Sequence, residues 1–300
     1  MKQEHVVNVP SPTTKLRYRT FTSADIPAAH ALSMALNWPY RPEDWQFSAD
    51  SAKGFVAEEC GVVIGTALCW KFGTDRASLG HVIVSSGHQG RGIGRKLMEA
   101  VLDELGPRIT FLHATSAGQP LYEKLGFNVC GSLEQYQGNI SKTFPVPLLD
   151  GERLRLGTSA DFPELIGLAA RASGLERNAI FSALLKFGES VVLEREGEVV
   201  GFSVLRRFGR GHVIGPVVAL RSRDDARARA LTGYWLTGRE GEFVRIDVPS
   251  GTSLTDWLSG QGLKRVDTVL KMVRNAPAGA HRGAPDPVCR LYGLISQAMF

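Results

Sequence analysis

Hydrophobic and polar positions alternate along the chain in a way that predicts a regular succession of strands and helices. In the first half a stripe of apolar residues recurs at helical spacing: Leu97, Val101, Leu102 and Leu105. This stripe predicts a helix over residues 92–105 with one buried face. Apolar runs at 78–84 and 109–114 predict strands on either side of it, and a shorter helix is expected around 120–125. The order and lengths of these elements fit a mixed α/β sheet.

The same order of elements occurs twice, because the chain contains an internal repeat. The segment TSADIP at 22–27 recurs as TSADFP at 158–163, an offset of 136 residues. The offset also aligns three pairs of glycines: Gly61 with Gly197, Gly65 with Gly201, and Gly126 with Gly262. An echo of Leu16-Arg17 is found at Leu154-Arg155, two residues out of this register. A register held over so long a stretch predicts two copies of one fold.

Proline and glycine mark the expected boundaries between the copies. The stretch 142–151, with two prolines and a terminal glycine, is the expected linker, so the predicted domains are 1–145 and 146–275. A second stretch rich in proline, glycine and alanine at 276–287 leads to a segment with helical spacing of apolar residues: Leu291, Leu294, Ile295, Ala298 and Met299. Residues 276–300 are therefore expected to form a linker and a C-terminal helix that docks on an apolar surface.

Composition narrows the class of protein and the compartment. The chain has 300 residues, 43% of them hydrophobic, and no apolar run long enough for a membrane helix. Its start lacks the apolar core of a signal peptide, so a cytoplasmic protein is expected. The formal charge of +5 favours an anionic partner, and charge alone leaves nucleic acid, a membrane surface and a phosphorylated cofactor open. The four cysteines are scattered without a CxxC pair, which predicts reduced thiols and no metal site.

The segment with the most distinctive chemistry is a glycine-rich turn between a strand and a helix. Gly90, Gly92 and Gly94 follow the apolar strand that ends at Val84. Glycines let the backbone approach a ligand closely, and the free N–H groups at a helix N-terminus attract phosphate. The spacing differs from both the Walker A loop and the dinucleotide-binding motif. From the glycines alone, a phosphate cradle and a plain tight turn are both open.

Two motifs in the first copy carry a family resemblance. Residues 89–94 (QGRGIG), placed five residues after Val84, resemble the pyrophosphate loop of the GCN5-related N-acetyltransferases (GNAT). Residues 120–127 (PLYEKLGF) resemble the second signature of that family. Through the repeat, the resemblance extends to the second copy and implies a bacterial subgroup with two tandem GNAT domains. Each domain is then expected to hold a central, mostly antiparallel sheet flanked by helices.

The resemblance also implies acetyl-CoA as the acetyl donor, with no metal. It implies a set of cofactor-binding residues in the first copy: Val82, Ile83, Val84, Gln89, Gly90, Arg91, Gly92, Ile93, Gly94, Arg95 and Thr115. Tyr122 is implied as the acid that protonates the departing thiolate, and a buried tyrosine with a satisfied hydroxyl group is the alternative. Thr115 stands where the family often has an asparagine.

The second copy lacks this chemistry. The positions that match the glycine loop fall at 224–229 (DDARAR), with no glycine and two carboxylates where phosphate would lie. Tyr122 maps onto Leu258. We expect the second copy to keep the fold but to have lost the cofactor site, because carboxylates repel phosphate.

The acceptor is less well determined. His81 on the central strand is a candidate base for deprotonating an amine, and a structural histidine in the strand remains equally open. Glu43 and Asp44 are alternative bases, in the segment 38–45 that resembles the family's acceptor region. Glu43 also belongs to the predicted acceptor pocket, whose aromatic members would wall it or simply pack: Trp38, Tyr40 and Trp45. The second domain is expected to close over the first and contribute acceptor-binding residues.

The leading function is an acetyl-CoA-dependent N-acetyltransferase that acts on a small-molecule amine by direct attack in a ternary complex. A protein lysine or N-terminal acetyltransferase and a non-catalytic acetyl-CoA sensor are the alternatives. Nucleic acid is not expected as a partner, because no basic surface interleaved with aromatic residues is visible. No membrane partner is expected either, and the chain is expected to be a monomer or a homodimer.

Overall fold

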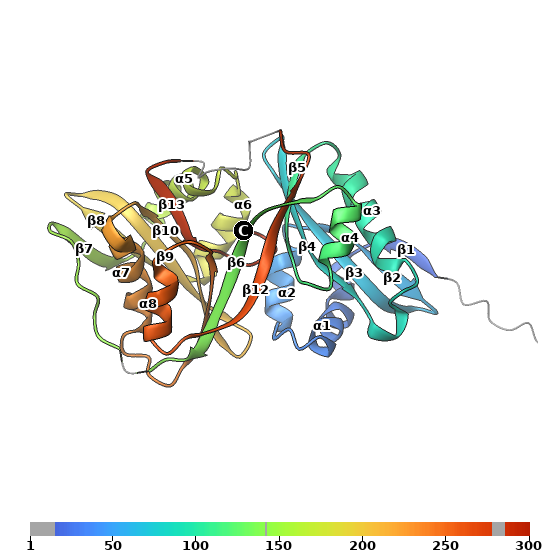
Figure 1. Ribbon diagram of the computed structural model, residues 1–300, viewed down its shortest axis with the longest axis horizontal. Coiled ribbons are helices and arrows are strands. Elements are labelled where there is room, and N and C mark those ends of the chain that lie inside the picture. The colour runs from blue at the N-terminus through green and yellow to red at the C-terminus, as the bar shows by residue number, and fades with distance from the viewer. Residues whose placement is uncertain (1–15, 142, 278–285) are drawn as a thin grey trace, which may run out of the picture.

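The computed structural model describes residues 16–141, 143–277 and 286–300 (Figure 1). The first copy forms these strands and helices: β1 (Arg17–Thr20), α1 (Ile26–Ala35), α2 (Pro42–Ala49), β2 (Lys53–Glu59), β3 (Val62–Phe72), β4 (Arg76–Val84), α3 (Ile93–Leu105), β5 (Ile109–Ala114), α4 (Gln119–Lys124) and β6 (Asn128–Asn139). The second forms β7 (Glu152–Leu156), α5 (Phe162–Ser173), α6 (Asn178–Phe187), β8 (Glu189–Arg195), β9 (Glu198–Phe208), β10 (Gly211–Leu220), α7 (Ala226–Leu236), β11 (Phe243–Pro249), α8 (Leu254–Gly260), β12 (Lys264–Arg274) and β13 (Cys289–Gly293).

The repeat is visible in side-chain contacts as well as in element order. Arg19 pairs with Asp25 at 2.7 Å and with Glu58 at 2.8 Å. The residues 136 positions later make the same network, in which Arg155 pairs with Asp161 and Glu194. Both arginines therefore tie the first strand of their copy to the following helix and to the second strand. The predicted two-residue shift near Leu154 is wrong, because Arg17 and Arg153 share the 136-residue register.

Within the described residues, the two copies share one sheet of thirteen strands. Its order is β1-β2-β3-β4-β5-β12-β6-β11-β10-β9-β8-β7, with β13 pairing β10 off this path. Strands β1 to β6 of the first copy correspond to β7 to β12 of the second. When these equivalent strands are exchanged, the order is the same from either end of the sheet, so a pseudo-twofold axis between β6 and β12 relates the two halves. Figure 1 shows these two strands crossing the middle of the molecule together.

Each half of the sheet is completed by the last strand of the other copy. In the first half, β12 pairs antiparallel with β5, with Leu270 opposite Ala114 and Arg274 opposite Thr110. In the second half, β6 pairs antiparallel with β11 from Leu133 to Asn139. The predicted boundary at residue 145 separates the two repeats along the sequence. It does not separate the two halves of the sheet, because each copy gives its last strand to the other half.

The expected C-terminal helix does not form. Residues 289–293 are strand β13, and the residues after it are irregular. Leu291, Leu294, Ile295, Ala298 and Met299 are intermediate or buried in the middle of the fold. Because this segment is surrounded by protein, apolar residues occupy positions that also match helical spacing, and the period alone cannot separate the two structures.

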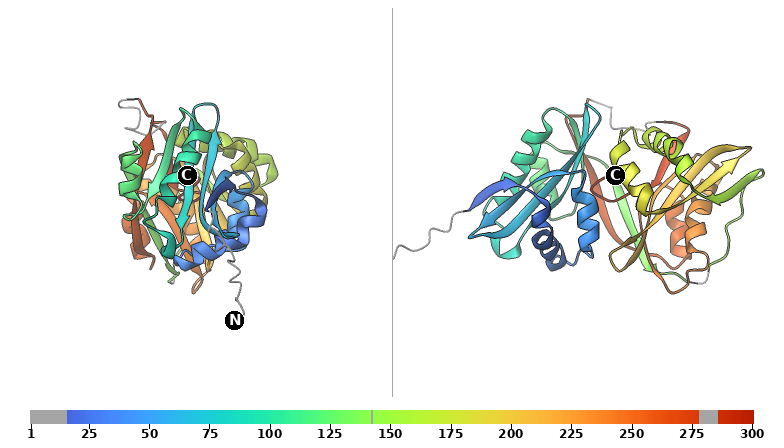
Figure 2. Two further views of the ribbon diagram at one scale, coloured as in Figure 1. Left: turned by 90° about the vertical axis from the view of Figure 1, so that its right-hand side faces the viewer. Right: turned by 180° about the vertical axis from the view of Figure 1, so that it is seen from behind.

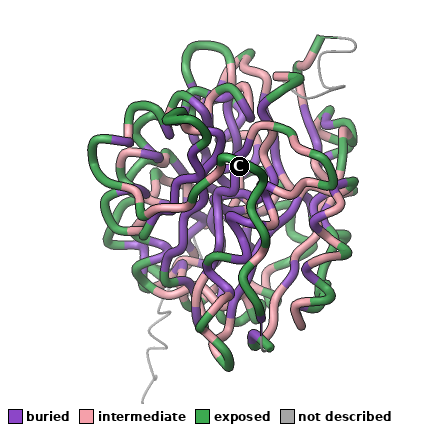
Figure 3. Tube along the Cα trace, turned by 90° about the vertical axis from the view of Figure 1, so that its left-hand side faces the viewer, coloured by how far each residue is buried: buried purple, intermediate pink, exposed green. Residues whose placement is uncertain are grey.

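Helices on the two sides of the sheet belong to different cores. Buried residues of α1, α2, α5 and α6 form one cluster that joins the copies and includes Trp45, Leu165 and Phe300. Helices α3 and α4 pack in a second cluster within the first half, and α7 and α8 in a third within the second half. Figures 2 and 3 show this arrangement from the ends and from behind, with buried residues gathered along the middle.

The exchange predicts that the first copy cannot fold alone. A fragment of residues 1–145 leaves the edge of β5 uncovered and removes both neighbours of β6, which are β11 and β12. We expect the fragment to be aggregated or to unfold without a cooperative transition, and we expect co-expression with residues 146–300 to restore a soluble heterodimer. Size-exclusion chromatography and thermal unfolding by circular dichroism measure this. A soluble monomeric fragment with cooperative unfolding would show that the first copy folds without β12, against this prediction.

Candidate active site

A groove opens in the first half where two parallel strands separate. Strands β4 and β5 pair only between Arg76–Ser78 and Ile109–Phe111, and beyond this point their facing edges diverge. The groove beside them has a volume of about 580 Å³. Its walls include all of the predicted cofactor-binding residues except Arg91, together with Trp38, His81 and Tyr122. The structure therefore brings the two sequence motifs of the first copy into one site.

One end of the groove is built to receive an anion. Gly90 and Gly92 adopt left-handed backbone conformations with φ of +77° and +76°, which favour glycine, and nothing lies within 4 Å of a Cβ placed on either. Gly92 precedes α3 and has no side chain to cap this helix. The first helical hydrogen bond runs from the N–H of Lys96 to the carbonyl group of Gly92. The earlier N–H groups of this helix have no partner within the helix and can bind phosphate.

Arg91 is the one predicted cofactor-binding residue that does not line the groove. Its guanidinium group pairs with Glu59 at 2.6 Å, and His88 lies 3.2 Å from the same carboxylate. The hydrogen bonds from Arg91 hold the pKa of Glu59 below its usual range. Arg91 thus ties the glycine loop to the end of β2, and it is not among the residues that line the groove.

A bulge in β4 shapes the centre of the groove. The pairing of β3 with β4 shifts between Thr66 and Leu68, where the extra residue of β4 is accommodated. His81 lies in this bulge with φ of +52°, a strained conformation for a residue other than glycine. The bulge comes directly before Val82 and Val84, which line the groove. Beyond the bulge, residues 82–84 are not paired with β5.

Tyr122 of α4 lies in the wall of the groove with its hydroxyl group unpartnered. The residue is 8% exposed, and its ring packs against Phe127. Gly118 permits this position, because a Cβ there would lie 2.9 Å from the tyrosine ring. Burial raises the pKa of Tyr122 to about 12, so the phenol stays protonated at neutral pH. Among the described residues none bonds to this hydroxyl group, which leaves it available to a ligand.

His81 is enclosed by aromatic rings. The ring lies 4.5 Å from Trp45 and 5.2 Å from Tyr40, measured between centroids, and the residue is 5% exposed. Burial lowers the pKa of His81 to about 4, so the imidazole is neutral at pH 7. Its Nε2 atom is buried without a hydrogen-bond partner among the described residues. His81 thus borders the groove, and its ring packs in the aromatic cluster.

The groove holds a second imidazole, His113 of β5, that the sequence did not single out. Its Nδ1 atom lies 2.6 Å from the carbonyl oxygen of Gln297, which can only accept a hydrogen bond. Nδ1 therefore carries the proton, and Nε2 of the neutral ring is an acceptor. Burial, together with the nearby charge of Lys271, lowers the pKa of His113 to about 3. The ring stacks on Phe300 at 4.4 Å.

Only some of the predicted acceptor residues, which lie in or next to the segment between α1 and α2, line the groove or the cavities beside it. Trp38 lines the groove and two neighbouring cavities, and Tyr40 lines both of those cavities. Trp45 is completely buried and donates a hydrogen bond from Nε1 to Ser33, so it belongs to the core. Glu43 has a side chain that is 72% exposed and lines none of these three spaces.

Asp44, the other carboxylate considered as a base, joins the two copies. Its oxygens accept hydrogen bonds from Arg41, from Arg206 at 3.4 Å and from the backbone N–H of Gly209 at 3.1 Å. The contact is tight, because a Cβ on Gly209 would lie 2.4 Å from the carbonyl oxygen of Pro39. A carboxylate so fully hydrogen-bonded is a structural group rather than a proton acceptor.

The corresponding cleft of the second copy is filled by the chain itself. Strand β10 pairs with β11 only at His212 and Val213, so these strands also separate. Strand β13 lies in the gap and pairs with β10 over Val217–Leu220, the residues that correspond to 81–84 in the first copy. After β13, the N–H of Leu294 bonds to the carbonyl group of Asp247 on β11.

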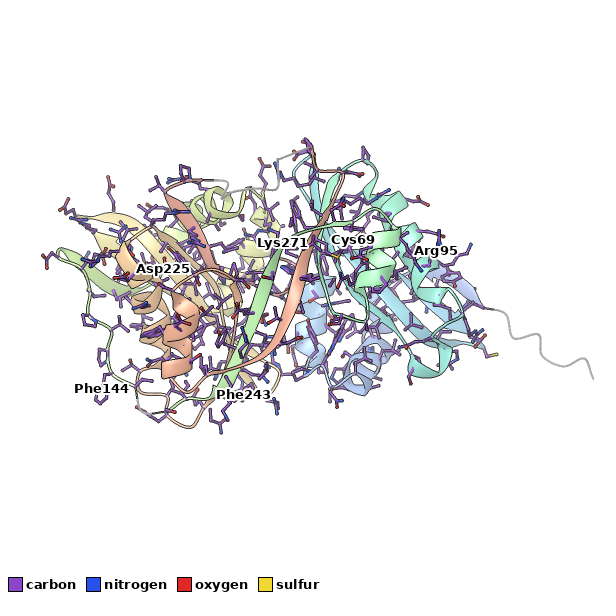
Figure 4. The ribbon with its side chains drawn as sticks, in the orientation of Figure 1. Cys69, Arg95, Phe144, Asp225, Phe243 and Lys271 are labelled. Atoms are coloured by element: carbon purple, nitrogen blue, oxygen red, sulfur yellow. The ribbon has the colours of Figure 1, made fainter. Side chains whose placement is uncertain are left out.

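The anion-binding end of this second cleft is also closed. The loop before α7 spans residues 221–225, whereas the corresponding loop of the first copy spans residues 85–92. It contains no glycine, and the hydroxyl group of Ser222 accepts a hydrogen bond from the N–H of Arg227 in α7. Asp225 accepts hydrogen bonds from Ser253 and from the Tyr292 hydroxyl group. Burial disfavours the charged form of Asp225, yet the hydrogen bonds from Ser253 outweigh it and hold the pKa low. Figure 4 labels Arg95 near the start of α3 and Asp225 at the start of α7.

The described residues offer no cluster of three or more histidine, cysteine or acidic side chains placed to bind a metal ion. All four cysteines are free thiols, and burial raises the pKa of Cys69 to about 12. No helix in the part of the chain that the structure describes is long and apolar enough to span a membrane.

Comparison with known proteins gives consistent matches in both copies. A model of the acetyltransferase (GNAT) family matches residues 19–127, and a model of an acetyltransferase (GNAT) domain matches residues 165–284. The chain is 30% identical over 226 residues to the uncharacterized N-acetyltransferase YitH of Bacillus subtilis, covering 74% of this chain and 76% of that protein.

Two solved structures share the fold over nearly the whole chain. One is a putative acetyltransferase from Pyrococcus horikoshii, with a TM-score of 0.74, 19% identity, and coverage of 99% of this chain and 100% of that one. The other is a tandem GNAT protein from the clavulanic acid biosynthesis pathway, with a TM-score of 0.65, 15% identity, and coverage of 88% and 99%.

Proposed function

Because the chain belongs to the GNAT family of N-acetyltransferases, we propose that it transfers the acetyl group of acetyl-CoA to the amine of a small molecule, through the groove of its first copy. The observation that carries this proposal is the convergence of an anion-binding loop, a free strand edge and Tyr122 on one groove. The second copy supports the first through the shared sheet and holds no second cofactor, since β13 fills its cleft.

The residues of the groove fit acetyl-CoA. Its pyrophosphate suits the free N–H groups at the start of α3, beside Gly90 and Gly92. Its pantetheine amides suit the edge of β4 at Val82–Val84, where the edge toward β5 is unpaired. When bound there, acetyl-CoA supplies an acetyl thioester that an amine can attack. Thr115 lines the groove beside Tyr122 and offers a hydroxyl group to the same ligand.

Tyr122 and His113 provide proton transfer on the two sides of the reaction. The amine nitrogen forms a bond to the thioester carbon, the carbon–sulfur bond breaks, and the products are an N-acetyl amine and the CoA thiol. The proton released by the amine passes to Nε2 of His113, and the Tyr122 hydroxyl group gives a proton to the sulfur. As the nitrogen–carbon bond forms the nitrogen becomes strongly acidic, so an imidazole of low pKa can accept its proton.

We assign the base role to His113 rather than to His81. The Nδ1 hydrogen bond to Gln297 fixes the His113 ring with Nε2 as acceptor. The Nε2 atom of His81 is buried in the protein and cannot touch an acceptor molecule without rearrangement. The ring of His81 instead packs against Trp45 and Tyr40 at the bulge of β4.

A small molecule is favoured over a protein as acceptor by the shape of the space next to the groove. The adjoining cavity that shares Trp38 and Thr115 with the groove has a volume of only about 240 Å³. Such a cavity encloses a small polar molecule, whereas a protein segment requires an extended surface.

The function predicts an acid role for Tyr122 that can be measured directly. With acetyl-CoA and a panel of small amines, the protein should release CoA thiol, detected by a thiol reagent. Tyr122→Phe should lower kcat roughly 10- to 100-fold, because the leaving thiolate loses its proton donor. The Kd for acetyl-CoA from calorimetry should stay within about twofold, since only one oxygen is removed.

Tyr136→Phe is the matched control, because this buried hydroxyl group bonds to Glu134 away from the groove. Its kcat should be unchanged. An undiminished kcat for Tyr122→Phe would exclude the acid role of Tyr122. If no amine in the panel and no lysine peptide led to thiol release, the proposed acetyltransferase activity would be excluded.

The low pKa of His113 predicts an unusual pH profile. With a folded pKa of about 3, the ring is already neutral above pH 5, so kcat/KM should follow only the deprotonation of the amine between pH 5 and 8. His113→Gln should lower kcat roughly 10- to 100-fold over that whole range. His212→Gln in the second copy serves as the control. An inflection of kcat/KM near pH 6.5 that His113→Gln removes would contradict this state of the ring.

A further inference from the structure

The cavity next to the groove is assembled from distant parts of the chain. It has a volume of about 240 Å³ and shares Trp38 and Thr115 with the groove, so the two spaces adjoin. Its other walls come from the segment between α1 and α2, from the exchanged strands, from β11 and from the residues after β13: Asn37, Pro39, Tyr40, Gln135, Arg245, Val266, Asp267 and Gln297. The second copy and the strand exchange therefore complete this space.

The charges in this cavity do not cancel. Arg245 is held by Asp247 through two hydrogen bonds, of 2.7 Å and 3.1 Å, and its positive charge also interacts with the carboxylate of Asp267. Asp267 on β12 is the other charged residue in the wall. Its carboxylate accepts a hydrogen bond from the N–H of Thr268, and in the described part of the chain no basic side chain lies within ion-pairing distance. One arginine, Arg245, thus faces two aspartates, Asp247 and Asp267, which leaves a net negative charge at this cavity, with the exposed Asp267 at its rim.

The remaining walls suit a polar, positively charged guest. The amide groups of Gln135 and Gln297 meet at 3.3 Å, which presents polar atoms to the cavity. Trp38 lies between the cavity and the groove, and an aromatic face attracts a cation. A molecule that spans this junction would place one end near the thioester and the other near Asp267.

We propose that this cavity binds the acceptor, and that the acceptor is a small aliphatic amine with a second cationic group held by Asp267. The proposal rests on the proposed function, because the acceptor end matters only if acetyl transfer occurs at the groove. The amine that reacts must be neutral, whereas the second group can stay protonated and pair with the carboxylate. An acceptor with a carboxylate at that end is disfavoured by the same charge.

Three probes with the same number of carbon atoms separate these possibilities: 1,4-diaminobutane, 1-aminobutane and 4-aminobutanoate. Each presents a primary amine, and their far ends are cationic, apolar and anionic. We expect kcat/KM to be about fivefold higher for the diamine than for the monoamine, and lower again for the amino acid. The difference is modest because Asp267 is exposed at the rim.

Asp267→Asn should remove most of the preference for the diamine by raising its KM, with kcat and the KM for acetyl-CoA unchanged. Asp267→Lys should reverse the preference toward 4-aminobutanoate. Asp256→Asn is the control, because this aspartate is exposed on α8 outside the cavity. Calorimetric binding of 1,4-diaminobutane to the CoA-saturated protein gives a readout independent of turnover, and Asp267→Asn should weaken it by a similar factor.

Equal kcat/KM for the three probes, no transfer to the diamine while other amines react, or diamine binding insensitive to Asp267→Asn would each overturn the inference and leave acetyl transfer intact. Failure of the proposed function is distinct, because it appears as a protein that neither binds acetyl-CoA nor releases thiol with any amine.

Discussion

The fold depends on the antiparallel pairing of β6 with β12. These strands occupy equivalent positions in the two copies, and each completes the sheet of the other copy. Neither half has a finished sheet without this exchange, because β5 needs β12 and β11 needs β6. The exchange brings Gln135 and Asp267 from the ends of the two copies to one cavity beside the groove. The second copy thus contributes residues to the cavity beside the groove of the first.

The two copies have the same strand separation but use it differently. In the first copy the gap between β4 and β5 leads to a glycine loop with free N–H groups. In the second copy β13 occupies the gap and Asp225 closes its end. The chain after β13 then reaches the first copy, where the carbonyl oxygen of Gln297 orients His113. The segment that fills one cleft therefore helps to build the other.

Much of the fold could be predicted from local pattern, and the remainder depends on distant partners. The strand 109–114 has the bounds expected from its apolar run, and the glycine loop lies at the start of α3 as its spacing indicates. The exchange could not be foreseen, because β6 and β12 derive from one repeated pattern that fits either half. The predicted C-terminal helix was wrong because apolar residues that are largely buried in an irregular segment also fall at helical spacing. His113 carried no signal, since its partner Gln297 lies 184 residues away, and Glu43 faces solvent because α2 turns it outward.

Counting acetyl-CoA sites per chain by isothermal titration calorimetry tests the central claim, that one cleft is open and the other is filled. The account predicts one site per chain. Gly92→Ala should weaken that site, because a side chain at φ of +76° is strained, whereas Asp225→Asn should leave it unchanged. Two sites per chain, or binding that is lost in Asp225→Asn and kept in Gly92→Ala, would contradict it.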